Sequence, residues 1–445
     1  MKFAATILSF ALGLSCWAND NVPAKAATKP LLIRGATIHP VSSEPIEDGQ
    51  MLIMNGEIID IVGPNVDLNL PVNTEVLQLP DKHVYPGMIA ANSVLGLVEI
   101  NAVRATVDMI EPGAINPNAR AQISVNPDSE LIPVTRANGV LSVLTIPRVS
   151  GNGLIGGQSA LMRLDGWTWE DMTIQAPAGM HLFWPELRSF PRWSSTDDEE
   201  ALKKMREAYD KAQTTLTDAL EDARAYGKAK ANGDTPIDAD LRWEAMLPVL
   251  AGKTRLFIHA QTSAQIRDAL HFAAKEKVES PVIVGGRDAW RLTDELSEAN
   301  AAVVLSPVNS LPRRWEAYDT TYTSATKLHE AEIPFCIANS GTAFTAANER
   351  NLPYQAGRAA AFGLPPEIAL KSITLYPAQI LGVDDRLGSL EQQKEATFFV
   401  SDGDPIEVTT NVERAWIQGR EIDLSSKHTR LYEKYQQRYQ QLQEQ

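Results

Sequence analysis

Three polar side chains in this sequence follow apolar runs and are placed where a reaction site could form. His259 ends the run Leu256-Phe257-Ile258. Asn92 follows the run 88–91, and Asn339 follows the run 335–338. An imidazole can act as a general base or bind a metal ion, whereas a neutral amide is a weak ligand for zinc. Short apolar runs of this kind are typical of buried parallel strands, so the three residues are expected at strand ends.

The elements that must position them alternate along the chain. Apolar strand-like runs and amphipathic helix-like runs follow one another, which predicts βα units and a parallel sheet. Strands are expected at 139–145, 159–164, 255–259, 281–286, 302–305 and 335–338, and helices at 198–230 and 263–275, the second capped by Ser263. Short strands are also expected before this region, around an Asn55-Gly56 hairpin, and after it, at 388–400 and 412–422.

The segment 84–94, Val-Tyr-Pro-Gly-Met-Ile-Ala-Ala-Asn-Ser-Val, resembles the first barrel strand of the amidohydrolase superfamily. The usual family form there is Pro-Gly, an apolar pair and Asp-x-His-x-His. Phe257-Ile258-His259-Ala260 is similar to the family's strand-five histidine, and 337–342 is similar to its strand-eight Thr-Asp-Ser. The chain looks closest to the imidazolonepropionase-like exported members.

This resemblance implies an α/β architecture with a composite domain. A (β/α)₈ TIM-like barrel would occupy 85–385, and a small β-sandwich would be built from both termini, 31–84 and 386–424. A C-terminal helix would occupy 425–445. The implied activity is hydrolysis of a carbon–nitrogen bond in a cyclic amide or dipeptide-like substrate.

The resemblance also implies that most family metal ligands are replaced. Asn92 and Val94 stand where two histidines are usual, Gly285 or Gly286 where strand six carries a histidine, and Asn339 where strand eight carries an aspartate. No strand-four ligand can be placed. Active relatives use zinc or another divalent ion, which needs at least three protein ligands in a catalytic site. We therefore expect no bound zinc and no other cofactor.

Two functions stay open on these grounds. One is a hydrolase with a non-standard site, in which His259 acts as a base or unrecognised ligands hold a metal. The other is a catalytically silent relative that binds a small molecule or a partner protein. Some loop carboxylates could rebuild a site, or they could equally be solvated or cap helices. They are Glu99, Asp108, Glu111, Asp128, Glu130, Asp165, Glu170 and Asp171. The six other histidines are scattered through the sequence.

Two further segments are unusual in composition. The glycine-rich segment 150–158 could cradle an anion with backbone amides or be a flexible turn. Aromatic residues in 165–171, 183–185 and 190–193 could pack a loop over the barrel or form a binding wall.

Composition and the N-terminus limit the partners and the compartment. The net charge of −15 argues against nucleic acid and anionic membranes. Lys2, the apolar run 3–14 and Ala18 predict a cleaved signal peptide, residues 1–18, and a periplasmic protein with no membrane span. Of the two cysteines only Cys336 would remain after cleavage, so no internal disulfide is expected. An oligomer is possible on this evidence.

Overall fold

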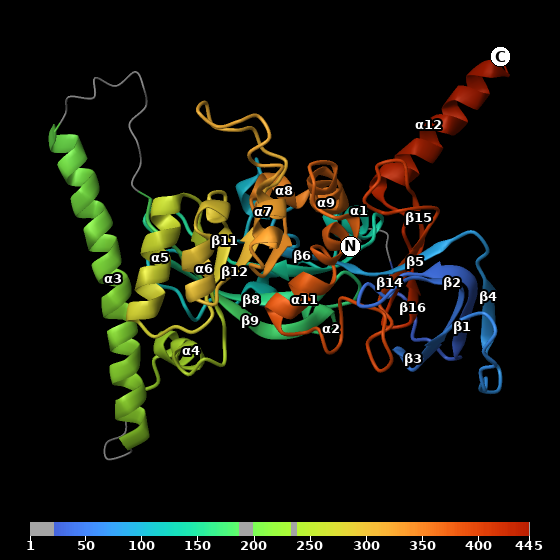
Figure 1. Cartoon of the computed structure of the whole chain (residues 1–445), viewed down its shortest axis with the longest axis horizontal. Coiled ribbons are helices and arrows are strands. Elements are labelled where there is room, and N and C mark those ends of the chain that lie inside the picture. Colours follow the sequence, from blue (N-terminus) through green and yellow to red (C-terminus); the bar gives the residue numbers. More distant parts are fainter. Residues whose placement is uncertain (1–21, 187–198, 233–237, 445) are drawn as a thin grey trace, which may run out of the picture.

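The computed structural model describes residues 22–186, 199–232 and 238–444, and it contains two eight-stranded sheets (Figure 1). The predicted signal peptide lies outside the described residues. The barrel sheet follows chain order from β6 to β13. Its strands are β6 Met88–Ser93, β7 Val140–Thr145, β8 Ile155–Arg163, β9 Thr173–Phe183, β10 Leu256–Ala260, β11 Val282–Gly285, β12 Ala302–Leu305 and β13 Phe335–Ile337.

Backbone hydrogen bonds bring the two ends of the barrel sheet together. The Ile337 amide of β13 donates to the Ser372 carbonyl at 2.9 Å, and the Ile89 amide of β6 donates to the Ile373 carbonyl at 2.9 Å. The two-residue segment 372–373 therefore links the first and last strands, and the sheet is a nearly closed barrel. Its interior is one large apolar cluster, as the apolar runs of the sequence predict.

One part of the barrel differs from the expected parallel sheet. Strand β8 is antiparallel to both β7 and β9, whereas the other neighbouring pairs are parallel. The connections 146–154 and 164–172 explain this, because a parallel crossover needs about a dozen residues or more. The prediction of βα units throughout the barrel was wrong at β8.

The helices lie mainly around the barrel. They are α1 Leu131–Arg136, α2 Trp169–Met172, α3 Glu199–Asn232, α4 Leu241–Leu250, α5 Ser263–Lys275, α6 Thr293–Glu298, α7 Ser324–Glu330, α8 Ala343–Ala346, α9 Leu352–Ala361, α10 Pro366–Lys371, α11 Leu375–Leu381 and α12 Lys427–Gln443. The predicted helix 263–275 is confirmed, but its cap is Thr262, which forms a capping box with Gln265. None of the described helices combines the length and apolar character needed to cross a bilayer.

The second sheet contains strands from both ends of the chain. They are β1 Leu31–Ile38, β2 Ile46–Met54, β3 Glu57–Val62, β4 Glu75–Gln78, β5 His83–Pro86, β14 Phe398–Ser401, β15 Val412–Ile417 and β16 Arg420–Ile422. Antiparallel pairing of β5 with β14 joins the two halves. The strands form one connected sheet, so the composite origin of this unit is observed, while its form as a two-layer sandwich stays a prediction.

Two helices extend beyond the compact body. Figure 1 shows α3 along one side of the barrel and α12 pointing away from the second sheet at the other end of the molecule. Within α3 the buried residues are confined to Leu216, Ala219, Leu220 and Ala223, and α12 buries none of its residues. The fully buried side chains of α3 therefore lie in the middle of the helix.

Candidate functional site

The sequence-predicted residues lie at the ends of barrel strands, as expected. Asn92 is near the end of β6, His259 is in β10, and Asn339 lies two residues beyond β13. The carboxyl ends of parallel strands form the active face of such barrels. The structure brings the two asparagines into contact, but within the described chain no hydrogen bond joins either of them to His259.

Asn92 and Asn339 belong to a buried group of four polar side chains, Asn92, Asn339, Glu349 and Gln355, which we call the asparagine cluster. The Asn92 side-chain amide donates to the Asn339 carbonyl at 2.8 Å. The Asn339 side-chain amide donates to Glu349 at 2.8 Å, and its oxygen accepts from Gln355. The cluster therefore ties β6, the end of β13, the helical turn Glu349–Asn351 and α9 together at the barrel mouth.

Glu349 is the member of this cluster that sequence reasoning missed. Its side chain is fully buried, and burial raises its pKa to about 7, although hydrogen bonds from Asn339 and Ser93 act in the opposite direction. At neutral pH a large fraction of this carboxyl is therefore protonated and uncharged. Glu349 lies ten residues after Asn339 in a short helical turn, and no sequence motif identifies it as a site residue.

His259 lies among aromatic rings rather than beside the asparagines. Its Nε2 is 2.9 Å from Nδ1 of His181, and its ring stacks on Phe183 with the centroids 4.0 Å apart. His181 in turn stacks on Phe257. The four rings share one face of β9 and β10, because Phe183 is in register with His259 and His181 with Phe257. Gly179 permits this packing, since a Cβ there would lie 2.3 Å from the Phe257 ring.

Both imidazoles are held in the neutral form. Burial and then the charge of Arg148 lower the pKa of His181 to about 3. Burial, His181 and Arg148, in that order, hold the pKa of His259 well below its usual value. One ring nitrogen of each histidine is used in their mutual hydrogen bond, and the buried Nε2 of His181 has no partner among the described residues. His181, one of the six histidines scattered through the sequence, is therefore the contact partner of His259.

The residues that the sequence resemblance places at the family's metal positions do not fit a zinc ion. Val94 has no donor atom, and the space beside Gly285 is filled by the Gln261 side chain. The Asn92 amide nitrogen faces a carbonyl, and its Oδ1 has no hydrogen-bond partner in the described chain, which leaves one neutral oxygen. The two adjacent imidazoles bind each other. Within the described residues, no three His, Cys, Asp or Glu side chains are grouped so that they could hold an ion, and zinc requires at least three such ligands.

The loop carboxylates considered from the sequence do not assemble a replacement site. Glu99 accepts hydrogen bonds from Ser129 and from the Glu130 amide. Asp165 forms a buried ion pair with Arg136 at 3.0 Å. Both acids hold loops and helices in place, but Asp165 is buried in an ion pair and is therefore neither solvated nor a helix cap, contrary to the alternative expected from the sequence.

A cleft of ≈ 960 Å³ opens beside the end of β9, between the glycine-rich segment and α3. We call it the Arg148 cleft; Arg148, Asn152, Phe183, Trp184, Tyr209 and Lys211 are among its lining residues. The Arg148 guanidinium lies over the Phe183 ring at 5.0 Å, and that ring contacts His259. His259 is not a lining residue of the cleft, but it contacts the cleft through the Phe183 ring. Part of the predicted aromatic wall, 190–193, lies outside the described residues.

A chain of side-chain contacts fixes the α3 wall of this cleft. The Trp184 indole donates to the Tyr209 hydroxyl at 3.1 Å, and Tyr209 donates to Asp268 of α5. Trp184 also packs on Phe272. Phe183 and Trp184 thus line the cleft from the β9 side, while Tyr209 lines it from α3.

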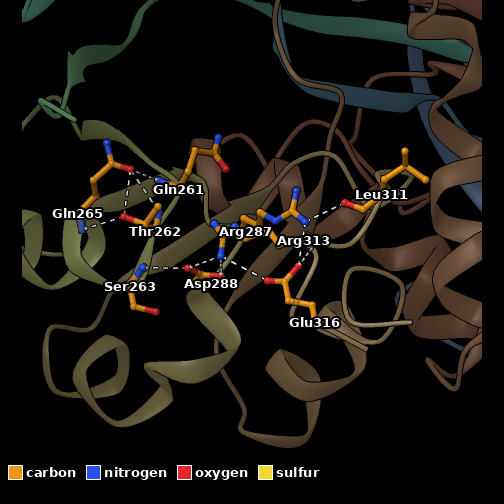
Figure 2. A network of polar contacts seen from close by, with 9 residues as sticks. All are labelled: Gln261, Thr262, Ser263, Gln265, Arg287, Asp288, Leu311, Arg313 and Glu316. Atoms are coloured by element: carbon orange, nitrogen blue, oxygen red, sulfur yellow. Dashed lines mark hydrogen bonds and ion pairs between the residues drawn. The ribbon is translucent and has the colours of Figure 1, made fainter. Parts of the chain in front are cut away.

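A second polar network lies at the ends of β10 and β11 (Figure 2). Arg313 donates to both oxygens of Asp288 at 2.8 and 2.9 Å, and Arg287 donates to Glu316 at 3.0 Å. Asp288 also accepts from the Ser263 amide at the start of α5. We call Arg287, Asp288, Arg313 and Glu316 the β12-loop network, because it fastens the segment after β12 to the neighbouring strands.

Comparison with known proteins agrees with this architecture. A family model described as "Amidohydrolase family" matches residues 256–422. An amidohydrolase from Thermotoga maritima MSB8 has a TM-score of 0.77 and 26% identity, over 88% of this chain and 99% of that one. These matches support the assignment of this chain to the amidohydrolase superfamily. The superfamily resemblance of the sequence is thereby supported, whereas the imidazolonepropionase-like subtype stays a prediction.

More distant relatives extend the comparison. The amidohydrolase tasK of Hapsidospora irregularis is 22% identical in an alignment 438 residues long, which covers 88% of this chain but only 43% of that protein. A prolidase solved with N-methylphosphonate-L-proline and a Xaa-Pro dipeptidase with bound methionine have TM-scores of 0.51 and 0.52 at 16% and 15% identity. Each of the two alignments covers 89% of this chain and 100% of the other protein's chain. At such identities these two structures show a shared fold.

Proposed function

We propose that this chain is an exported amidohydrolase relative that binds a small organic molecule at the barrel mouth without a metal ion. The observation that carries this proposal is the asparagine cluster. By the family resemblance it occupies two metal positions with asparagines: the Asn92 side chain donates to the Asn339 backbone carbonyl, and the Asn339 side chain donates to Glu349. The proposed compartment is the periplasm, on the basis of the segment 1–18, and the proposed subtype is imidazolonepropionase-like.

The Arg148 cleft is the proposed binding place. It is large enough for a small organic ligand, since such pockets measure about 300–1,000 Å³, and it has aromatic walls beside polar groups. Because two structural neighbours are named for prolidase and Xaa-Pro dipeptidase activity, dipeptide-like molecules are the first compounds to test.

Binding should then be independent of metal. Chelator-treated protein and protein supplied with zinc should bind a panel of Xaa-Pro dipeptides with equal affinity in calorimetry. The Phe183→Ala variant should lose affinity, because Phe183 lines the cleft and contacts both Arg148 and His259. Binding that appears only with zinc, or a variant that binds like the wild type, would refute the proposal.

Hydrolysis without a metal is the second candidate, and Glu349 is the observation that favours it. A carboxyl with a pKa of about 7 has a value suited to general acid–base catalysis at neutral pH. Its complete burial and its bond to Asn339 work against contact with a substrate, which is why binding is preferred. Cleavage of a dipeptide that rises with pH around 7 and is lost in Glu349→Gln would establish this candidate.

A further inference from the structure

Three arginines in the barrel region have lowered pKa values because burial removes them from water: Arg136, Arg148 and Arg163. Arg136 lies 3.0 Å from Asp165, and Arg163 lies 3.3 Å from Glu395. Arg148 differs from both. Among the residues that the structure describes, no acid forms an ion pair with it, and its guanidinium contacts the Phe183 ring.

A partly buried cation without a counter-ion is costly, because the lost hydration is not replaced. The neighbouring histidines cannot compensate for this charge, since both are neutral. Arg148 itself contributes to lowering the pKa of each imidazole, so its positive charge acts on both histidine rings. A bound anion would supply the missing counter-charge.

The rest of the cleft has the same electrostatic character. Its lining includes a second cation, Lys211, and one acid, Glu186. The lining is therefore positive, although the whole chain carries a net charge of −15. Gly151 and Gly153 lie on the wall beside Arg148 and bring backbone close to the cleft without side chains.

We propose that the Arg148 cleft binds a carboxylate-bearing small molecule, with Arg148 as the contact to the carboxylate. A guanidinium suits this task, because its planar donors match the two oxygens of a carboxylate. Phe183 and Trp184 would hold the apolar part of the same ligand. This inference rests on the proposed function and narrows it to acids such as N-acyl amino acids or dipeptides with a free C-terminus.

Matched pairs of acids and amides test the inference directly. N-acetyl-phenylalanine, N-acetyl-leucine and Phe-Pro would each be compared with the corresponding C-terminal amide by calorimetry of the full mature chain. We expect at least one acid to bind about ten-fold or more tightly than its amide, since a hydrogen bond to a charged group contributes roughly 1.5–3 kcal/mol.

Arginine variants identify the contact. Arg148→Met should abolish the preference for the acid over its amide, whereas Arg148→Lys should retain part of this preference. Arg267→Met is the matched control, because Arg267 lies on α5 in an exposed pair with Glu295 and does not line the cleft. It should bind the acid as the wild type does.

The outcomes separate this inference from the proposed function. Equal binding of acids and amides, lost in Phe183→Ala, would overturn the anion contact while leaving small-molecule binding intact. Retention of the acid preference in Arg148→Met would also overturn it. If no member of the panel binds, both the inference and the proposed binding function are contradicted.

Discussion

Two regions at the mouth of the barrel treat buried polar groups in different ways. In the asparagine cluster, amide side chains and a carboxyl are hydrogen-bonded across β6, the end of β13 and α9, although Asn92 Oδ1 and Glu349 Oε1 have no partner in the described chain. In the Arg148 cleft, a cation faces an open space with no acid paired to it in the described chain. The asparagines at the positions of the family's metal ligands are bound to their neighbours, whereas Arg148, which pairs with no acid in the described chain, lines the cleft that we propose as the ligand site.

The largest expected effect comes from returning a family-like acid to the asparagine cluster. Asn339→Asp would place a second carboxylate against Glu349 and remove the donor that Glu349 now accepts. We expect a loss of about 3–5 kcal/mol in the free energy of unfolding at pH 8 and no gain of hydrolysis. Urea denaturation measures the loss, with the exposed Asn300→Asp as control. An unchanged free energy of unfolding would show that the hydrogen bond between Asn339 and Glu349 contributes little to stability.

The pH dependence of stability tests the same cluster through Glu349. Its pKa is about 7 in the folded chain against an ordinary value of 4.5, so the folded state holds the proton more tightly. The contribution of Glu349 to the free energy of unfolding should therefore be greatest below pH 4.5. It should fall by roughly 3 kcal/mol as the pH rises from there through 7. Glu349→Gln should flatten this slope between pH 5 and 8. A variant whose slope equals that of the wild type would contradict the assignment.

The β12-loop network offers a paired arginine for comparison with Arg148. Arg313→Met would leave Asp288, which is 5% exposed, with only the Ser263 amide as partner. We expect a loss of about 1–3 kcal/mol in unfolding free energy. A stable variant at neutral pH would mean that this network contributes little.

Arg148→Met should have the smallest effect on the free energy of unfolding, and it should stabilise the protein, whereas Asn339→Asp and Arg313→Met should destabilise it. Removing an unpaired cation relieves a desolvation cost, while the contact with the Phe183 ring is lost. We expect the unfolding free energy to change by less than about 1 kcal/mol, toward greater stability. Thermal unfolding of the unliganded variant checks this. A clear destabilisation would indicate a counter-ion for Arg148 within the chain and would weaken the case for an anionic ligand.

The sequence predicts the fold better than the site, for reasons visible in particular residues. The apolar runs of β10 to β13 and the helix 263–275 are local signals, and they were located almost to the residue. The direction of β8 depends on the lengths of two connections, which alternation alone does not reveal. The match of family positions placed Asn92 and Asn339 at strand ends, and the structure joins them.

The remaining site residues depend on packing between distant segments. His181 meets His259 only through the register of β9 against β10, which no spacing in the sequence encodes. Glu349 is marked by burial rather than by a motif. Arg148 pairs with no acid in the described segments, and this can be recognised only once the neighbouring elements are in place.

The most direct test of the whole account is elemental analysis of the purified protein after dialysis against a chelator. The account predicts far less than one equivalent of zinc or any other divalent transition metal, and no difference between the wild type and His259→Ala. One or more equivalents of zinc, retained through dialysis and lost in His259→Ala, would contradict it and would restore metal-dependent hydrolysis as the function.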